Sequence, residues 1–223
     1  MARVTYKLSP TLHATLDVDN GSWSGTARKA VYTDRGSGDK LIVEGNGLDY
    51  QNGNLADGTL SKLSLVDAEG EKFETLTGFK LDAEAFSGNN FMARFEKAMG
   101  KILDNDLNVI GTKFEDEIIG RKGNDIIFGG ADNDELGGGA GADKLTGGDG
   151  VDTFVFREGY EKETITDFDT DGSDGFQDFI QAAFSELESI TGSDEKTILN
   201  FGDGDTIVLL GVHPSTIDVT DFV

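Results

Sequence analysis

"GGAGADKLT" occupies residues 138–146, and "GGDGVDTFV" follows it at 147–155. Three more nine-residue words precede them in the same register: "GTKFEDEII" at 111–119, "GRKGNDIIF" at 120–128 and "GGADNDELG" at 129–137. We number these five words repeats 1 to 5 in chain order. A helix would not tolerate so many glycines, because each one costs about 1 kcal/mol relative to alanine in a helix interior.

Two positions of the repeats keep a strict phase. Position 6 is always aspartate: Asp116, Asp125, Asp134, Asp143 and Asp152. Position 8 is always apolar: Ile118, Ile127, Leu136, Leu145 and Phe154. A disordered Gly/Asp-rich linker would not keep an apolar residue fixed to one position. The spacing therefore predicts a repeat architecture.

The residue types in each repeat fit a metal-binding turn followed by a strand. Glycine allows the first six residues to turn sharply and lets backbone carbonyl groups converge. Calcium takes six to eight oxygen ligands, which carbonyl groups and carboxylates can supply together. The last three residues form a short strand whose apolar side chain points inward. The pattern G-G-x-G-x-D-x-U-x (U is apolar) is that of calcium-binding parallel β-rolls, in which repeat n lies beside repeat n+2.

Residues 111–155 resemble the RTX family of secreted bacterial proteins. The resemblance implies three or more calcium ions, each held between one repeat and the next but one. One site would join Thr112, Phe114 and Asp116 to Gly129, Ala131 and Asp134. A second would join Arg121, Gly123 and Asp125 to Gly138, Ala140 and Asp143. A third would join Gly130, Asp132 and Asp134 to Gly147, Asp149 and Asp152.

Some repeats depart from the family pattern. Phe114 and Asp132 replace glycine at position 4, and Thr112 and Arg121 replace it at position 2. Aspartate tolerates the left-handed backbone region, whereas phenylalanine does so badly. We therefore expect the first of the three sites to be the weakest.

The remaining chain divides into three regions. Residues 1–86 alternate apolar and polar side chains in short segments such as "VTYKL" and "KLIVEG", which predicts an antiparallel sheet or a small sandwich. Residues 87–110 change to a helical spacing, with Phe91, Met92, Phe95, Met99 and Ile102 on one face, and predict a linking amphipathic helix. Residues 156–223 contain the apolar strands "TILNF" and "DTIVLLGV" and predict a cap on the roll that ends at 155. The predicted fold class is mostly all-β.

Three acidic features of residues 156–223 stand outside the repeats. The ending Asp221, Phe222 and Val223 resembles the uncleaved C-terminal signal of type I secretion. The segment 167–178, "DFDTDGSDGFQD", resembles an EF-hand loop, although an acidic turn is the simpler interpretation. Glu161 and Glu163 could complete a last site of the roll. Whether either group binds a further ion stays open.

Composition limits the possible partners. The chain has 42 Asp plus Glu against 19 Lys plus Arg, a net charge of -23, so it repels nucleic acid and anionic membrane surfaces. It has no cysteine, which excludes disulfides and thiol catalysis. Its two histidines lie far apart in sequence and offer little for a histidine metal site. No apolar run approaches the length of a transmembrane span. The N-terminus lacks the apolar core of a signal peptide, so we expect export by type I secretion machinery.

These features predict a secreted, extracellular, non-enzymatic calcium-binding protein that presents an N-terminal binding or adhesion module. A cell-surface polysaccharide is the expected ligand of that module, with Trp23 and Tyr50 as aromatic candidates that could instead belong to its core. The alternative is a small secreted enzyme acting on an extracellular polysaccharide. No H-E-x-x-H motif is present, and "GSWSG" at 21–25 has tryptophan where a G-x-S-x-G motif has serine. A pore-forming toxin is rejected because it would need long apolar segments.

Overall fold

The computed structural model describes residues 22–26, 28–33, 40–51, 54–66, 72–82, 104, 106–170 and 177–223. The chain forms two compact units, which meet in sequence at Val109 and Ile110. The described residues form strands and three short 3-10 segments, with no α-helix among them. The prediction of a mostly β chain is therefore confirmed. None of the described helical segments is long and apolar enough to cross a membrane.

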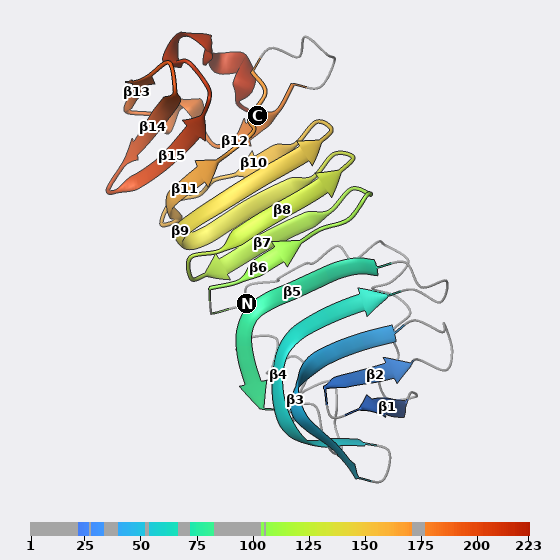
Figure 1. Ribbon diagram of the computed structural model, residues 1–223. Helices are drawn as coiled ribbons and strands as arrows, with labels where there is room; N and C mark the ends of the chain where they lie inside the picture. Colours follow the sequence, from blue (N-terminus) through green and yellow to red (C-terminus); the bar gives the residue numbers. More distant parts are fainter. Residues whose placement is uncertain are drawn as a thin grey trace. The chain divides into compact units, whose positions relative to one another are not determined.

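The N-terminal unit is an antiparallel sheet in which each strand pairs with the next one along the chain (Figure 1). Its strands are β1 (Ser22–Thr26), β2 (Lys29–Thr33), β3 (Lys40–Gln51), β4 (Asn54–Val66) and β5 (Lys72–Asp82). Side chains of β3 and β4 form its core: Leu41, Val43, Leu48, Leu60, Leu63 and Val66. Register shifts in the pairing of both strands interrupt the strict alternation that the sequence predicts. Trp23 lies on β1 and Tyr50 on β3, but their side chains lie outside the described part, as do the strands expected before residue 22.

The linking helix expected at 87–110 falls mostly on residues 87–103, which lie outside the described part. Its last residues, Asn108–Ile110, form strand β6, so the prediction is wrong there. Val109 is buried between two exposed neighbours, and the Gly111 amide then donates to the Phe128 carbonyl (2.8 Å). Strand β6 pairs with the strand of repeat 2, and this pairing outweighs the helical spacing of the sequence at the end of the segment 87–110.

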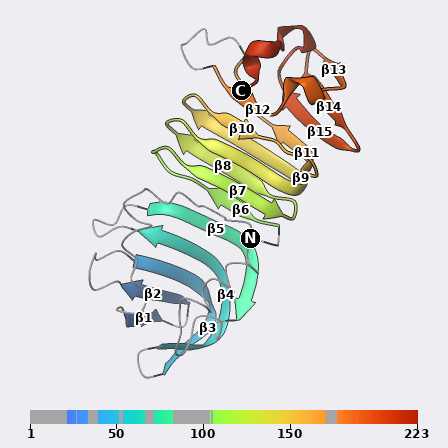
Figure 2. The same ribbon diagram turned by 180° about the vertical axis from the view of Figure 1, so that it is seen from behind.

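The repeats form a parallel β-roll. Its strands are β7 (Glu117–Lys122), β8 (Ile126–Ala131), β9 (Glu135–Asp149) and β10 (Thr153–Val155), and the long β9 pairs in parallel with each of the other three (Figures 1 and 2). Each parallel pair joins equivalent residues of repeats n and n+2: Ile118 with Leu136, Ile127 with Leu145, and Leu136 with Phe154. Repeats 1, 3 and 5 therefore line one side of the roll, and repeats 2 and 4 line the other.

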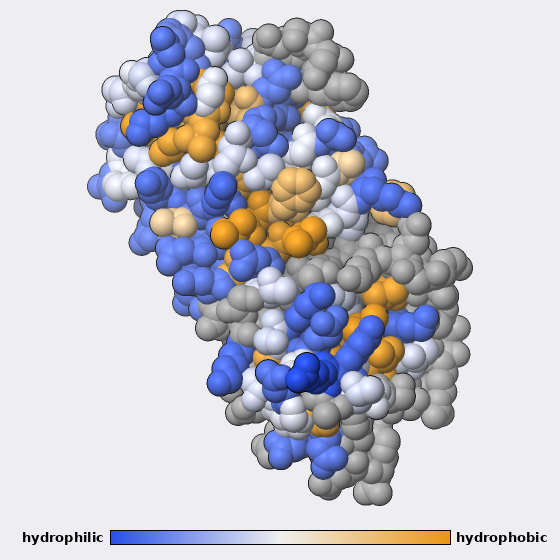
Figure 3. All heavy atoms as spheres, viewed as in Figure 1, coloured by the Kyte–Doolittle hydropathy of each residue, from blue (hydrophilic) through white to orange (hydrophobic). Residues whose placement is uncertain are grey.

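The position-8 side chains form a narrow core between the two sides. Four of them have no exposed surface and Ile118 has 3%. On β8, Ile126 and Phe128 flank the buried Ile127 and are exposed. Figure 3 shows such apolar patches among hydrophilic surface on one face of the molecule. Each repeat therefore buries about one large apolar side chain, which is a thin core for so much ordered backbone.

Parallel pairing continues beyond residue 155. Strand β11 (Glu161–Ile165) adds to β9 with Ile165 beside Leu145, and β12 (Phe179–Gln181) adds to β10 with Ile180 beside Phe154. These partners lie farther apart in sequence than two repeats. The nine-residue phase ends at 155, but the roll does not.

An antiparallel set of strands closes the roll, as the apolar segments predict. It contains β13 (Ser189–Ser193), β14 (Lys196–Gly202) and β15 (Asp205–Leu210), and β15 joins the roll through parallel pairing with β11. The 3-10 segments are η2 (Phe184–Glu186), η3 (Pro214–Thr216) and η4 (Val219–Asp221). The final residues pack on β12, where the Val223 amide donates to the Ile180 carbonyl (3.1 Å). Asp221, at 1% exposure, accepts a hydrogen bond from Gln177.

Candidate metal centre

The turns of the roll bring the predicted ligands of each site together in pairs of loops. On one side, Gly130 is beside Gly148 and Ala131 is beside Asp149. On the other, Arg121 is beside Gly139. The loops of repeats n and n+2 thus stack as the predicted sites require. The metal-ligand role of their residues stays a prediction.

Backbone conformation separates repeat 1 from the others. In repeats 2 to 5, positions 2 and 4 all have positive φ: Arg121, Gly123, Gly130, Asp132, Gly139, Gly141, Gly148 and Gly150. Asp132 adopts this region with φ of 73°, as expected of aspartate, and Arg121 adopts it with φ of 82°. Thr112 and Phe114 do not. Repeat 1 therefore presents its carbonyl groups in a different arrangement.

Side-chain contacts in repeat 1 replace the left-handed turn. The Phe114 amide donates to Thr112 Oγ1 (3.0 Å), and the Thr112 amide donates to Asp116 Oδ2 (2.7 Å). The second carboxylate oxygen of Asp116 is thereby occupied by its own loop. Phe114 itself is exposed.

The glycine that opens each repeat has a steric role that the sequence reasoning missed. A Cβ atom at Gly138 would collide with the Asp143 carboxylate, and one at Gly147 would collide with that of Asp152. Repeats 2 and 3 show the same collision. Position 1 therefore lies against the aspartate of its own repeat. Its presence as glycine in all five repeats was the available signal.

A ladder of hydrogen bonds joins the buried aspartates. Asp134 Oδ1 accepts from the Asp116 amide (2.8 Å), and Asp152 Oδ1 accepts from the Asp134 amide (2.9 Å). On the other side of the roll, Asp143 Oδ1 accepts from the Asp125 amide (2.7 Å). All five aspartates are at most 8% exposed. Each of these contacts links one repeat to the next but one and fixes the stacking of their loops.

Asparagine at position 5 adds a second contact of the same kind, which the sequence reasoning also missed. Asn124 Oδ1 accepts from the Ala142 amide (3.0 Å), and Asn133 Oδ1 accepts from the Val151 amide (2.8 Å). Asparagine at the same position of two successive repeats was the signal for it.

The ladder leaves a buried oxygen without a partner at Asp134. Its Oδ1 holds the Asp116 amide, but its Oδ2 is buried and has no hydrogen-bond partner. Burial is the main reason that the pKa of Asp134 is raised to about 8, and the carboxylates of Asp152, Asp116 and Asp132 add to it. Burial also raises the pKa values of Asp116 and Asp152. Such groups need either protons or a cation.

The donor set fits a hard cation that uses backbone as well as side-chain oxygens. Within the described ranges, no three His, Cys, Asp or Glu side chains gather closely enough to hold a metal by themselves. Two aspartates and the carbonyl groups of two stacked loops provide the oxygens that calcium prefers. Two of the predicted carbonyl ligands also accept hydrogen bonds, Thr112 from Ala131 and Ala140 from Gly123. A carbonyl oxygen has two lone pairs and can serve both partners.

Beyond repeat 5, Asp178 continues the ladder. Its Oδ1 accepts from the Asp152 amide (2.9 Å) and its Oδ2 accepts from the Asp169 amide (3.0 Å). Burial raises the pKa of Asp178 to about 7. Asp167 accepts from the amides of Gly147 and Gly148. The segment 167–178 therefore binds the end of the roll through its carboxylates.

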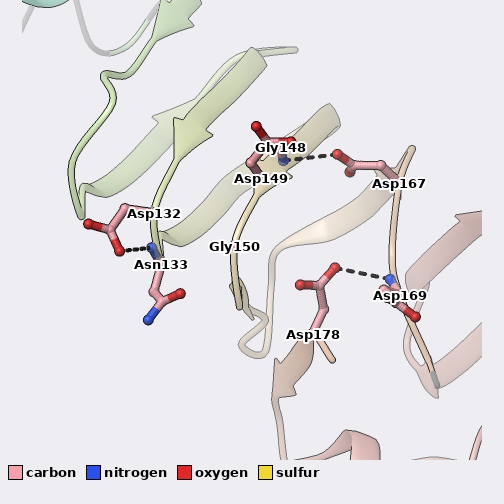
Figure 4. A pocket seen from close by; sticks show the side chains of 8 residues that line it. All are labelled: Asp132, Asn133, Gly148, Asp149, Gly150, Asp167, Asp169 and Asp178. Carbon is pink, nitrogen blue, oxygen red and sulfur yellow. Dashed lines mark hydrogen bonds between the residues drawn. The ribbon is translucent and has the colours of Figure 1, made fainter. Parts of the chain in front are cut away.

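Figure 4 shows the acidic hollow beside this segment. Its volume is about 570 Å³, and it is lined by Asp132, Asn133, Gly148, Asp149, Gly150, Asp167, Asp169 and Asp178. Asp171 and Asp174, which the EF-hand interpretation needs, lie outside the described residues. The described contacts of Asp178 are hydrogen bonds within an acidic turn that closes the roll, and an ion in the segment 167–178 stays a prediction.

Glu163 is a buried carboxylate outside the nine-residue register. It has no exposed surface, and its Oε1 accepts from the Gly138 amide (2.8 Å). Burial, and after it the Asp143 carboxylate, raises the pKa of Glu163 to about 8. Glu161, on the same strand, is exposed.

The model of the RTX calcium-binding nonapeptide repeat, in four copies, matches residues 108–136 and 136–160. Residues 108–160 are RTX calcium-binding repeats. The RTX segment thus continues past the end of repeat 5. Among curated proteins, none matches the chain.

Solved structures similar to the chain include two subunits of the mannuronan C5-epimerase from Azotobacter vinelandii. The AlgE6R3 subunit is 29% identical over 53% of this chain and 77% of its own, with a TM-score of 0.41. The AlgE6R2 subunit is 26% identical over 51% of this chain and 90% of its own, with a TM-score of 0.38. The extracellular lipase LipA from Serratia marcescens is 16% identical over 92% of this chain and 31% of its own, with a TM-score of 0.43.

The raised pKa values predict how the calcium-free RTX roll responds to pH. The folded-state pKa values of Asp134, Glu163 and Asp178 lie at about 8, 8 and 7, above those of carboxyl groups in an unfolded chain. Their contribution to stability is therefore fully present below about pH 4 and is lost as pH rises through about 7 to 8. In EGTA, the folded fraction of the roll should therefore rise as the pH is lowered from about 8 to about 5.

Circular dichroism in EGTA at several pH values would measure this change. The control is the same series in saturating calcium, where the folded fraction should stay constant or rise with pH because metal binding needs deprotonated carboxylates. A calcium-free roll that becomes more stable with rising pH over this range would contradict the prediction.

Proposed function

We propose that the chain is a secreted, non-enzymatic calcium-binding protein whose RTX roll folds on binding calcium outside the cell. The observation that carries this proposal is the buried Oδ2 of Asp134, which lies between stacked loops with no hydrogen-bond partner. A calcium ion there would neutralise the aspartates on that side of the roll. Calcium supplies only charge neutralisation and loop ordering, and the chain itself supplies the oxygens.

We expect at least three ions between residues 111 and 155, with the ligand sets expected from the sequence, and the stacking of the loops supports this number. Loops of repeats 1 and 3, 2 and 4, and 3 and 5 each form one pair. Asp134 belongs to the middle loop on its side and would serve two ions. The Asp116 site is the weakest of the three, because Thr112 and Phe114 do not take the left-handed conformation of the other loops.

The energetics of the roll support coupled folding and binding. Repeats 1 to 5 contain ten acidic residues against four basic ones, and twelve glycines. Ordering backbone costs about 1–2 kcal/mol per residue, whereas each repeat buries about one large apolar side chain. Calcium binding would supply the difference, so that folding and binding are one event.

This coupling gives a physical reason for export as an unfolded chain by type I secretion machinery. Free calcium on the order of 10⁻⁷ M inside a cell would leave the weak sites of the roll empty, and about 10⁻³ M outside would fill them.

The N-terminal unit would then be the module that the roll carries to the cell exterior. We propose that it binds a cell-surface polysaccharide. An antiparallel sheet with its own core, near charge balance over residues 1–110 (16 acidic against 12 basic), can fold without the metal.

The coupling predicts that EGTA at about pH 8, where the buried carboxylates lose their protons, unfolds residues 111–223 while the N-terminal unit stays folded. Circular dichroism and limited proteolysis of the full chain, with and without calcium, would measure both. The expected result is a protease-resistant N-terminal fragment in EGTA and full resistance in about millimolar calcium. A calcium-free chain whose RTX half is already β-rich and protease-resistant would refute the coupling.

The difference between loops predicts unequal effects of two aspartate substitutions. Asp143→Ala should lower the apparent calcium affinity by about tenfold or more, because it removes a charged ligand from a site built on left-handed loops. Asp116→Ala should lower it by less than about threefold, since its loop is already distorted. Calorimetric titration compares the two variants, and equal losses would show that Phe114 does no harm to its turn.

Polysaccharide binding by the N-terminal unit predicts glycan-dependent retention of the full chain. A glycan array probed in about millimolar calcium should give binding to one class of polysaccharide. A chain lacking residues 111–223 should keep the same profile if the module acts alone. Absence of binding to any glycan, with the roll folded, would overturn this role and leave the calcium proposal intact.

A further inference from the structure

Glu163 occupies the place of a repeat aspartate on the side of the roll that holds Asp125 and Asp143. It lies beside Asp143 in the parallel register of β9 and β11. Two positions later, Ile165 lies beside Leu145 in the core, as the position-8 residue does in each repeat. The offset of Glu163 from Asp143 exceeds two repeats, so the nine-residue register does not reveal it.

The Glu163 carboxylate meets that of Asp143 at one glycine. Gly138 donates its amide to Glu163 Oε1 (2.8 Å). A Cβ atom on the same residue would collide with the Asp143 carboxylate. Two buried carboxylates, at 0% and 2% exposure, therefore lie against opposite parts of Gly138.

One oxygen of Glu163 is left without a hydrogen-bond partner. Oε1 accepts the hydrogen bond from the Gly138 amide, whereas Oε2 is buried and forms no hydrogen bond of good geometry. Burial raises the pKa of the carboxylate more than the nearby Gly139 amide lowers it. Asp134 has the same arrangement: its Oδ1 accepts a hydrogen bond from an amide, and its Oδ2 has no hydrogen-bond partner. Burying a bare carboxylate oxygen beside a second carboxylate is costly unless a cation or a proton compensates it.

We propose that Glu163 and Asp143, together with carbonyl groups of the loop 138–143, hold a further calcium ion at the end of this side of the roll. The proposal rests on calcium binding by the RTX repeats and adds a site that their motif does not contain. Asp143 would then serve two ions, as Asp134 would on the opposite side. The longer glutamate side chain compensates for the changed offset of its strand.

The test counts calcium ions on the full chain by native mass spectrometry at saturating calcium. We expect four ions on the unaltered protein and three on Glu163→Gln. Glutamine keeps the size of the side chain and an oxygen acceptor for the Gly138 amide, but it removes the charge. The matched control is Glu161→Gln, which removes a charge from an exposed side chain of the same strand and should leave four ions.

The outcomes separate this site from the function on which it rests. No calcium on the unaltered protein would overturn both. An equal ion count on the unaltered protein and Glu163→Gln, or an equal loss in both variants, would overturn this site alone. A Glu163→Gln chain that keeps every ion and becomes more stable in EGTA would show that the buried glutamate is a neutral acid.

A variant that fails to fold would appear in circular dichroism as loss of the whole roll. In that case Glu163→Asp takes its place, because it keeps the charge and withdraws the carboxylate by one methylene. The affinity for one ion should then fall by about tenfold while the others keep theirs. Unchanged affinity for every ion would overturn the site.

Discussion

The hydrogen bond between a repeat aspartate and the backbone amide of the aspartate two repeats earlier is the contact on which the roll depends. It draws each carboxylate into the stack, where it fixes the spacing of two loops. The same contact removes the carboxylate from water and places it near others of the same charge. Asp134, with one oxygen on the ladder and one bare, shows both effects. Stacking and cation binding are therefore two consequences of one geometry.

Glycine serves this geometry in two separate ways. At positions 2 and 4 it permits the left-handed backbone, which Asp132 and Arg121 also adopt. At position 1 it leaves room for the carboxylate of its own repeat, and any side chain there would displace the aspartate. Repeat 1 has the glycine at position 1 but lacks the left-handed backbone at positions 2 and 4. Its aspartate joins the ladder, but its loop is closed by contacts between Thr112, Phe114 and Asp116.

At the ends of its two sides, the roll satisfies the last carboxylate differently. On the side of repeats 1, 3 and 5, Asp178 continues the ladder, and both of its oxygens accept amide hydrogen bonds. On the side of repeats 2 and 4, Glu163 lies beside Asp143 but accepts the Gly138 amide, so it does not continue the ladder, and its Oε2 has no hydrogen-bond partner. Hydrogen bonds complete the first end. The second end needs a proton or a cation.

The sequence by itself determined the roll, its nine-residue phase, the side on which each repeat lies and the inward position-8 residues, because similar local turns repeat without interruption. Alternation also predicted the N-terminal strands, as an antiparallel sheet or a small sandwich, and the closing strands. Tertiary pairing alone revealed that β11 and β12 extend the roll, that Asp178 ends the ladder and that Glu163 lies beside Asp143. Their offsets depend on the irregular segments before them, which no local period encodes. It also decided that Asn108–Ile110 is a strand and that Asp221 is buried, since pairing and packing with distant residues outweigh local preference at both places.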